Sequence, residues 1–386
     1  GVSVVVPAHN AAVTLETCIR ALLASDAAIA EIIIADDASD GGEPARMLEL
    51  DPRVSVVRTG DRPVGPASAR NTAASRATSD VIVFVDADLR VHPGTVGTLI
   101  EPLRTEPGVV ACFGSYDDDP PAKAAASLYA NLRHHSVHQA APADGTTFWS
   151  GLGAVRREAF EAAGGFDAGF GKPSIEDVEL GTRLREQGGV IRVVHGAQAT
   201  HLKAWTVSGL WRTDIFARAI PWARLSVDRP ELLASLNAGP REKLAALGVA
   251  AALAALLLVW FLPGPLALAA GGAGLAGLGW WAWHNRRLLH LLRLRGGVRA
   301  LLIGGVLHAV YYVYSSAIYV LGGAAFGWRA CWADRRGSTV LWSIVFLGLF
   351  AGGSICLLLA VMSTETLLDG LMRLERDPTR PRYSLE

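Results

Sequence analysis

Residues 81–88 have the pattern of a buried strand that ends in two carboxylates, and this stretch constrains the fold more than any other part of the chain. The continuous apolar run Val81–Val85 fits a central strand covered on both faces. Asp86 and Asp88 follow at alternate positions, so on an extended chain both side chains point the same way. Ligands of open α/β sheets bind at this end of the strands, and two acids there can hold Mg²⁺ or Mn²⁺ through oxygen. A surface turn that happens to contain two acids is the alternative interpretation.

Strand and helix patterns alternate before this stretch. Apolar runs rich in β-branched residues at 2–6, 31–35 and 54–57 are separated by segments with helical spacing. The alternation predicts an α/β domain with a mostly parallel, Rossmann-like sheet and right-handed crossovers. Asp37 and Asp86 would then both lie at the carboxyl ends of strands, where we expect a nucleotide.

The second half of the chain differs from the first in composition. Lys plus Arg and Asp plus Glu number 36 each, so the formal net charge of zero gives no case for a nucleic-acid partner. Beyond Lys243, however, long stretches carry almost no charge. Four of these stretches have about the ~20 apolar residues that a bilayer crossing needs. They are 244–262, 265–283, 300–327 and 339–362.

Arginine positions predict the orientation of these segments. The loop 284–299 is rich in arginine and is therefore expected on the cytoplasmic side, together with the first domain, which is two crossings away. Arg329, Arg335 and Arg336 would then face outside, which disagrees with the rule. We expect a multi-pass protein of the cell membrane with a cytoplasmic tail at 364–386.

Several short motifs, in order and with their spacing, are similar to those of one enzyme family. They are VSVVVPAHN, IIIADDASD, GPASARNTA, VFVDADLRVHPG, SGLGAVRREAF, GGFD and SIEDVELGTRLREQGG. Between about Val2 and Arg224 the chain resembles family 2 glycosyltransferases, inverting enzymes of the GT-A fold. The resemblance implies a domain at 1–204 that binds a UDP- or GDP-sugar together with Mg²⁺ or Mn²⁺.

The resemblance also implies roles for residues in the donor half. Asp37 would hydrogen-bond the base, Asp88 would ligate the metal, and Asp86 would contact the ribose or a metal-bound water. Arg70 would lie near the diphosphate, for which a guanidinium offsets developing negative charge. The nucleotide cleft would be lined by Pro7, Ala8 and Asn10. Taken singly, Asp37 could be a turn acid and Arg70 part of a solvated helix face.

In the acceptor half, the resemblance places the catalytic base at Asp177, with Glu176 shaping the site. Displacement at an anomeric carbon needs a base that takes the proton of the acceptor hydroxyl on the face opposite the leaving group. The alternative is structural: Ser174 as an N-cap, with acids that stabilise the first turn of a helix.

Three further residues follow the last predicted strand. His201 is a third metal ligand, a diphosphate contact or a structural histidine, and Lys203 can meet a phosphate. Arg212 falls where processive relatives carry a Gln-x-x-Arg-Trp motif, but the glutamine is absent. Upstream, His134 and His138 are i, i+4 neighbours that belong to a metal cluster or, without acids at ligand spacing, to a solvated or acceptor-facing helix.

The segment 205–240 mixes tryptophan, arginine and aliphatic residues, which suits an amphipathic helix at the membrane surface, although an ordinary packing helix has the same pattern. An all-α transmembrane bundle at 241–363 would follow. Together these features predict a membrane-anchored glycosyltransferase that acts on a polyprenyl phosphate or other membrane lipid. Two alternatives stay open: a processive polysaccharide synthase with an export channel, and an inactive membrane-bound partner that binds sugar nucleotides.

Overall fold

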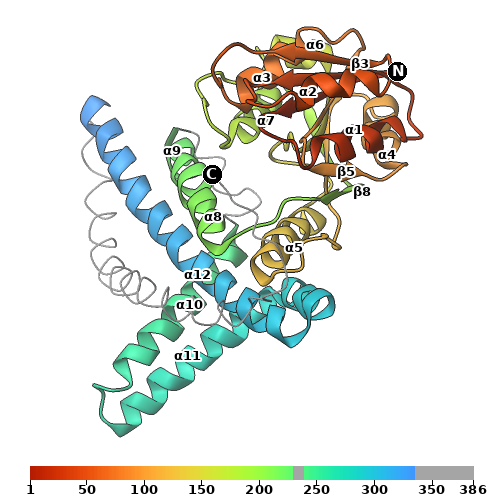
Figure 1. Cartoon of the computed structure of the whole chain (residues 1–386). Helices are drawn as coiled ribbons and strands as arrows, with labels where there is room; N and C mark the ends of the chain where they lie inside the picture. Colours follow the sequence, from red (N-terminus) through yellow and green to blue (C-terminus); the bar gives the residue numbers. More distant parts are fainter. Residues whose placement is uncertain (229–238, 335–386) are drawn as a thin grey trace.

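The computed structural model describes residues 1–228 and 239–334, and for 227–228 and 323–334 it describes the helical backbone alone. The predicted apolar segment 339–362 and the tail 364–386 lie outside the described residues. The N-terminal part forms a sheet domain, from which a set of long helices extends (Figure 1).

Eight strands form one sheet in the order β3-β2-β1-β4-β7-β6-β8-β5. The strands are β1 Val2–Ala8, β2 Ile29–Asp36, β3 Val54–Arg58, β4 Val81–Val85, β5 Leu89–Val91, β6 Val109–Tyr116, β7 Leu152–Arg156 and β8 Val190–His201. The half that contains β3, β2, β1 and β4 is parallel, as predicted. The other half is mixed, because β7 runs antiparallel to both β4 and β6 while β6 and β8 are parallel.

Helices cover both faces of the sheet, so β1 and β4 are buried on each side. One core contains apolar residues of α1 (Leu15–Leu23) and α4 (Thr95–Thr105). The opposite core contains those of α3 (Pro66–Ala74), α6 (Arg157–Ala162) and α7 (Glu176–Glu186). A short helix and a 3₁₀ turn, α2 Glu43–Arg46 and η1 Met47–Glu49, lie between β2 and β3.

The central strand β4 has the predicted bounds, but the two acids do not continue it. The strand ends at Val85, and Asp86 begins a turn in which the Leu89 amide donates to the Asp86 carbonyl over 3.0 Å. The prediction that Asp86 and Asp88 share an extended backbone was therefore wrong. Both side chains nevertheless reach the same cavity, because the turn lies at the carboxyl end of the sheet.

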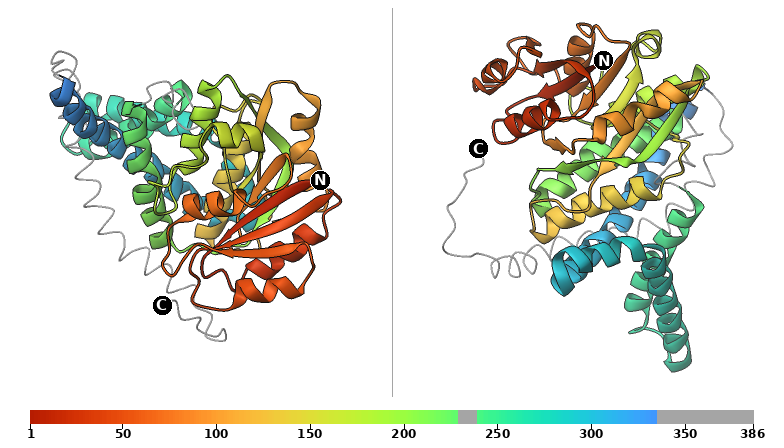
Figure 2. Two further views of the ribbon diagram at one scale, coloured as in Figure 1. Left: turned by 90° about the horizontal axis from the view of Figure 1, so that it is seen from above. Right: turned by 90° about the vertical axis from the view of Figure 1, so that its right-hand side faces the viewer.

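A second layer of helices joins the sheet domain to the C-terminal helices. Helix α5 (Ala125–Ala140) packs against α12 (Arg286–Asp334) through an apolar cluster that includes Leu128, Leu132 and Leu292. The segment predicted at the membrane surface is α8 (Val207–Arg212), a π-helical stretch η2 (Thr213–Ala219) and α9 (Ile220–Asp228). This segment runs alongside α12 (Figure 1), and the different views of Figure 2 agree on this arrangement.

The first two predicted membrane segments form a helical hairpin. Helices α10 (Pro240–Leu258) and α11 (Gly264–His284) are joined by a short turn at Pro263 and project away from the sheet domain (Figure 1). They approach closely at Gly248 and Gly277, where a Cβ on Gly248 would lie 2.6 Å from the Gly277 carbonyl oxygen. Such contact between small residues is typical of helices that pack within a bilayer.

The predicted loop 284–299 is helical instead. Helix α12 starts at Arg286 and continues to Asp334, with one interruption at Gly297, whose φ of 68° lies in the left-handed region that favours glycine. Among the described residues, one helix is long and apolar enough to cross a membrane, Arg286–Gly322. About 33% of the most apolar part of this helix is buried within the structure.

Candidate active site

One continuous cavity of about 2470 Å³ runs from the carboxyl ends of the strands to α12. Nearly all the site residues predicted from the sequence line it: Pro7, Ala8, Asn10, Asp37, Arg70, Asp86, Asp88, Glu176, Asp177, His201 and Lys203. Arg212 does not; it is exposed on α8. The fold therefore brings the predicted donor residues and the predicted base into one space.

At the donor end, Asp88 faces His201. The Asp88 Oδ2 atom is 3.2 Å from His201 Nε2, and His201 Nδ1 is hydrogen-bonded to Asn131 Oδ1. The His201 ring also stacks on Tyr116, with centroids 4.2 Å apart. Burial acts to raise the pKa of Asp88, but the hydrogen bond to His201 and the charges of His201 and Lys203 lower it below its usual value. The carboxylate of Asp88 and the ring of His201 therefore face each other.

Arg70 connects the turn after β4 to the start of α7. Its Nη2 donates to Asp86 Oδ1 over 2.7 Å and its Nη1 donates to Glu176 Oε1 over 2.9 Å. The guanidinium is 6% exposed, and its Nε has no hydrogen-bond partner. Burial and the negative charge of Asp88 raise the pKa of Asp86, although Arg70 opposes this effect. The solvated-face interpretation of Arg70 is therefore wrong.

The carboxylate of Asp177 lies at the first turn of α7. It accepts hydrogen bonds from the backbone amides of Ser150 (3.2 Å) and Val178 (2.8 Å). Burial, and after it the negative charge of Glu176, raises the pKa of Asp177 to about 7. Ser174 is not the N-cap: that position is Ile175, and the Ser174 hydroxyl donates to the Ala217 carbonyl of η2 over 3.1 Å.

At the far side of the donor end, Asp37 organises a loop. It accepts from the Thr59 hydroxyl and from the backbone amides of Val64 and Gly65, all at 2.8–2.9 Å. Gly65 has a φ of 92°, and a Cβ there would clash with Gly171 backbone. Asn10 has a φ of 50°, and its side chain is hydrogen-bonded to Asp40: its Nδ2 donates to Asp40 Oδ2, and its Oδ1 accepts from the Asp40 amide.

With this geometry in place, comparison with known families is informative. Residues 3–164 match the family described as "Glycosyl transferase family 2". This part of the chain is therefore similar to family 2 glycosyltransferases. The parallel β3-β2-β1-β4 half of its mixed sheet agrees with the GT-A fold that the resemblance implies.

Two curated relatives illustrate how far the similarity extends. The O-antigen biosynthesis protein RfbC of Myxococcus xanthus is 29% identical over 250 residues, which cover 60% of this chain and 19% of that protein. The Escherichia coli enzyme UDP-Glc:alpha-D-GlcNAc-diphosphoundecaprenol beta-1,3-glucosyltransferase WfgD is 34% identical over 88 residues, which cover 22% of this chain and 34% of the enzyme. The chain thus spans about a fifth to a third of the length of these relatives.

Among solved structures, the chain is similar to the mannosyltransferase PcManGT from Pyrobaculum calidifontis in complex with GDP-Man and Mn²⁺. The TM-score is 0.48 and the identity 21%, over 85% of this chain and 87% of the other. At this TM-score the likeness does not by itself establish a shared fold.

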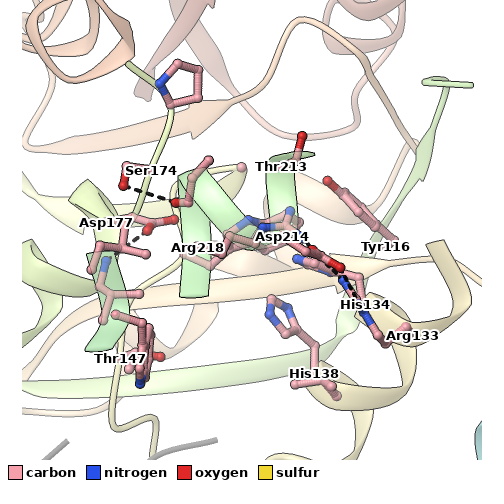
Figure 3. Close-up of a pocket in the computed structure, with 18 of the residues that line it drawn as sticks. Tyr116, Arg133, His134, His138, Thr147, Ser174, Asp177, Thr213, Asp214 and Arg218 are labelled. Atoms are coloured by element: carbon pink, nitrogen blue, oxygen red, sulfur yellow. Dashed lines mark hydrogen bonds and ion pairs between the residues drawn. The ribbon is translucent and has the colours of Figure 1, made fainter. Parts of the chain in front are cut away.

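The acceptor end of the glycosyltransferase domain contains residues that the sequence did not single out. Asp214 of η2 is 1% exposed and pairs with Arg133 (2.7 Å), Arg218 (3.0 Å) and the Tyr314 hydroxyl (2.8 Å). Arg133, Asp214 and Arg218 all line the cavity; in Figure 3, Arg218 lies between Asp177 and Asp214, and Arg133 lies on the other side of Asp214. The available signal was an Asp and an Arg four residues apart, on one face of a helix, in a segment rich in apolar residues.

Aromatic rings complete the wall between the two ends. His134 stacks on Tyr116 with centroids 4.2 Å apart and lies 4.6 Å from Trp149. His138 is buried, and its Nδ1 is 3.0 Å from the Gly114 carbonyl oxygen. Burial lowers the pKa of His138 to about 4. Both histidines line the cavity, and residues 1–228 and 239–334 contain no group of three or more His, Cys, Asp or Glu arranged to hold a metal. Whether the two histidines face an acceptor stays a prediction.

Proposed function

We propose that the chain is a membrane-anchored inverting glycosyltransferase that transfers a sugar from a UDP- or GDP-sugar to a lipid acceptor. The observation that carries this proposal is that Asp88 and Asp177 line one cavity, which continues to α12, the helix long and apolar enough to cross a membrane. A donor and a lipid-embedded acceptor can therefore meet in one space.

Of the three predicted metal ligands, two fit Mg²⁺ or Mn²⁺. Asp88 Oδ2 and His201 Nε2 face each other over 3.2 Å, and with the His201 proton on Nδ1, bonded to Asn131 Oδ1, the Nε2 lone pair would bind a cation in place of its contact with Asp88. Asp86 is instead bound by Arg70. Two protein ligands suit an ion whose shell is completed by substrate phosphates. Such an ion, when bound, would offset the negative charge that develops on the departing diphosphate.

The chain's own residues supply the rest of the chemistry. Asp177 takes the proton of the acceptor hydroxyl, and its pKa of about 7 suits a general base at neutral pH. Glu176 and Asp86 both hold Arg70, so the base helix is fixed to the turn that carries Asp88. Asp37 and Asn10 keep the nucleotide end of the cavity in shape through their hydrogen bonds to neighbouring loops.

Exposed apolar side chains support a membrane location. Among the side chains that the structure describes, the large exposed hydrophobic ones within the first 226 residues are Val13, Leu48, Val64 and Phe216, whereas the others lie between Leu244 and Leu321. Patches of this kind mark membrane or partner contacts. Arg295, in the arginine-rich start of α12, pairs with Asp118 of the glycosyltransferase domain over 2.7 Å. This ion pair supports our proposal that the start of α12 and the sheet domain lie on the same, cytoplasmic side of the membrane.

The lipid acceptor and the multi-pass topology extend this proposal further. The name of WfgD describes a sugar acceptor linked to diphosphoundecaprenol, which makes a lipid-linked acceptor a reasonable expectation here. We propose crossings at 244–262, 265–283, 300–327 and 339–362, the last of which lies outside the described residues.

The test uses the purified full chain in lipid vesicles, radiolabelled nucleotide sugars and lipids extracted from native membranes. We expect one sugar to be transferred, with a requirement for Mn²⁺ or Mg²⁺. Asp177→Asn should lower turnover by about 10²–10⁴-fold, the range for loss of a general base, while nucleotide-sugar binding is unchanged. Asp88→Asn should weaken Mn²⁺ binding measured by electron paramagnetic resonance in the presence of nucleotide.

The control is Asp26→Asn, which removes an exposed carboxylate outside the cavity and should leave turnover unchanged. Near-normal turnover in Asp177→Asn would remove the base from the proposal. A ladder of products in place of a single addition would favour the processive synthase, and absence of transfer with every donor would favour the inactive partner.

A further inference from the structure

The cavity extends well beyond the residues that the proposed reaction uses. Past Asp177 it is lined by Trp222 of α9 and by Tyr311, Tyr312 and Tyr319 of α12. The hydrogen bond from Ser174 to Ala217 holds η2 against the start of the base helix. An acceptor that approaches from the membrane side must therefore pass η2 before it reaches Asp177.

The wall at this passage carries a surplus positive charge. Two guanidinium groups, those of Arg133 and Arg218, share the single carboxylate of Asp214. Burial acts to raise the pKa of Asp214, but the charge and hydrogen bond of Arg133, and then Arg218 and Tyr314, lower it to about 2. The one negative charge of Asp214 thus faces the two positive charges of Arg133 and Arg218. A ligand with an anionic group would neutralise the remaining positive charge.

Arg218 is the guanidinium of the two that is available to a ligand. Arg133 is 11% exposed and is covered by the rings of Tyr129 and Tyr311, with its guanidinium carbon 5.2 Å and 4.4 Å from their centroids. Arg218 is 46% exposed and opens into the cavity between Asp177 and Asp214 (Figure 3). The Asp214 contact orients Arg218, and its remaining N–H groups are free to bind a phosphate.

The other end of the passage excludes an anionic nucleophile. Asp177 and Glu176 are adjacent carboxylates with one guanidinium, Arg70, close by, and Arg70 is already shared with Asp86. A phosphate oxygen placed at Asp177 would be repelled, and it has no proton for a base to remove. A neutral hydroxyl suits this position instead.

We propose that the acceptor is a glycolipid whose sugar hydroxyl lies at Asp177 and whose phosphate or diphosphate linkage is bound by Arg218. In a bare polyprenyl phosphate the phosphate itself is the nucleophile, and it would have to lie at the negatively charged Asp177 and not at the positively charged Arg218. Such an acceptor therefore does not fit the site. This inference rests on the proposed function and narrows its acceptor. The hydroxyl oxygen bonds to the anomeric carbon, its proton passes to Asp177, and the nucleoside diphosphate leaves.

The first experiment identifies the acceptor. Native membrane lipids are separated by anion exchange into neutral and anionic fractions, and each is incubated with the purified full chain and radiolabelled nucleotide sugar. Synthetic polyprenyl phosphate and glucose 1-phosphate serve as the bare-phosphate and water-soluble probes. We expect labelled product from the anionic lipid fraction, at least about tenfold above the other three, and a mass that places the new sugar on an existing sugar.

The outcomes separate the two levels of the proposal. Transfer to polyprenyl phosphate, or equal transfer to the neutral fraction, would overturn the inference but keep the enzyme a lipid glycosyltransferase. Transfer to glucose 1-phosphate at the rate of the lipid fraction would overturn the lipid part of the inference. Failure with every fraction, although the donor binds, would count against the proposed function itself.

The second experiment tests Arg218 directly. Arg218→Gln should raise the KM for the anionic lipid acceptor by about 10-fold or more, as expected for loss of a charge-assisted hydrogen bond, without changing the dissociation constant of the nucleotide sugar. Arg218→Lys should restore part of the loss. Arg224→Gln is the matched control, since Arg224 is exposed on α9 and does not line the cavity. A weaker nucleotide-sugar affinity in Arg218→Gln, with an unchanged acceptor KM, would place Arg218 on the donor and overturn the inference.

Discussion

The two ends of the cavity are built in different ways. The donor end collects side chains that follow the carboxyl ends of strands, so Asp37 after β2 and Asp88 after β4 are positioned by the parallel half of the sheet. The acceptor end is assembled from three helices that are distant in sequence: Arg133 and Asp214 are 81 residues apart, and Asp214 and Tyr314 are 100 apart. Under the proposed function, residues that bind the donor would be positioned by the sheet, whereas residues that bind the acceptor would be positioned by how the helices pack on it.

The largest expected effect comes from removing Arg70, which joins the turn after β4 to the start of α7. Arg70→Met leaves Asp86 and Glu176 without their shared cation in a buried site. Removing one partner of such a buried pair costs about 3–5 kcal/mol, so we expect this loss in the free energy of unfolding in detergent. Arg76→Met, which removes an exposed guanidinium just after α3, is the control. A loss below about 1 kcal/mol would mean that the two ends are not held together by Arg70.

The second prediction concerns pH and isolates the base. Asp177 acts only when deprotonated, so kcat/KM should rise about tenfold per pH unit below its pKa of about 7 and level off above it. The raised pKa also means that the folded state holds this proton more tightly than the unfolded state. The contribution of Asp177 to stability is therefore fully present at low pH and is lost as the pH rises through about 7.

Two measurements check this prediction: a pH–rate profile of the wild type, and unfolding of the wild type and Asp177→Asn across the same range. The wild type should lose stability relative to the variant between about pH 4 and 7. A flat rate profile through pH 7 would show that another group, or the bound donor, sets the protonation of the base.

The smallest expected effect tests how the helices dock on the sheet domain. Arg295 of α12 and Asp118 are each about one-third exposed, so their pair should contribute only about 0.2–1 kcal/mol. A double-mutant cycle with Arg295→Gln and Asp118→Asn, read by thermal unfolding in detergent, measures this coupling. A value well above 1 kcal/mol would contradict the view that apolar packing of α5 on α12 holds the two parts together.

Much of the donor end was predictable, because strands and the acids that follow them are local features. The apolar run 81–85 became β4 with the predicted bounds, and Asp37, Asp86 and Asp88 all reached the cavity. The partners of these acids were less predictable. Arg70 was expected near a diphosphate, but it pairs with Asp86 and Glu176, since only the folded chain brings residues 70 and 176 together.

The acceptor end was mostly beyond the reach of sequence patterns. Arg212 was selected because of its place in a motif, yet the arginine of segment 207–228 that lines the cavity is Arg218, on the π-helical stretch η2. A π-helix changes the angular spacing of side chains, so a helical count from Trp211 does not indicate which residues face inward. The arginine-rich segment 284–299 was likewise expected as a loop but is part of α12.

The sequence by itself determined the α/β class, the acids at the strand ends, the helix that begins near Asp177 and the apolar character of the second half, because each of these is fixed by periodicity or by neighbouring residues. The tertiary structure alone decided that Asp88 and Asp177 share a cavity and that Asp214 holds two arginines beside it. These are contacts between residues far apart in the chain, and their distances depend on how the helices pack.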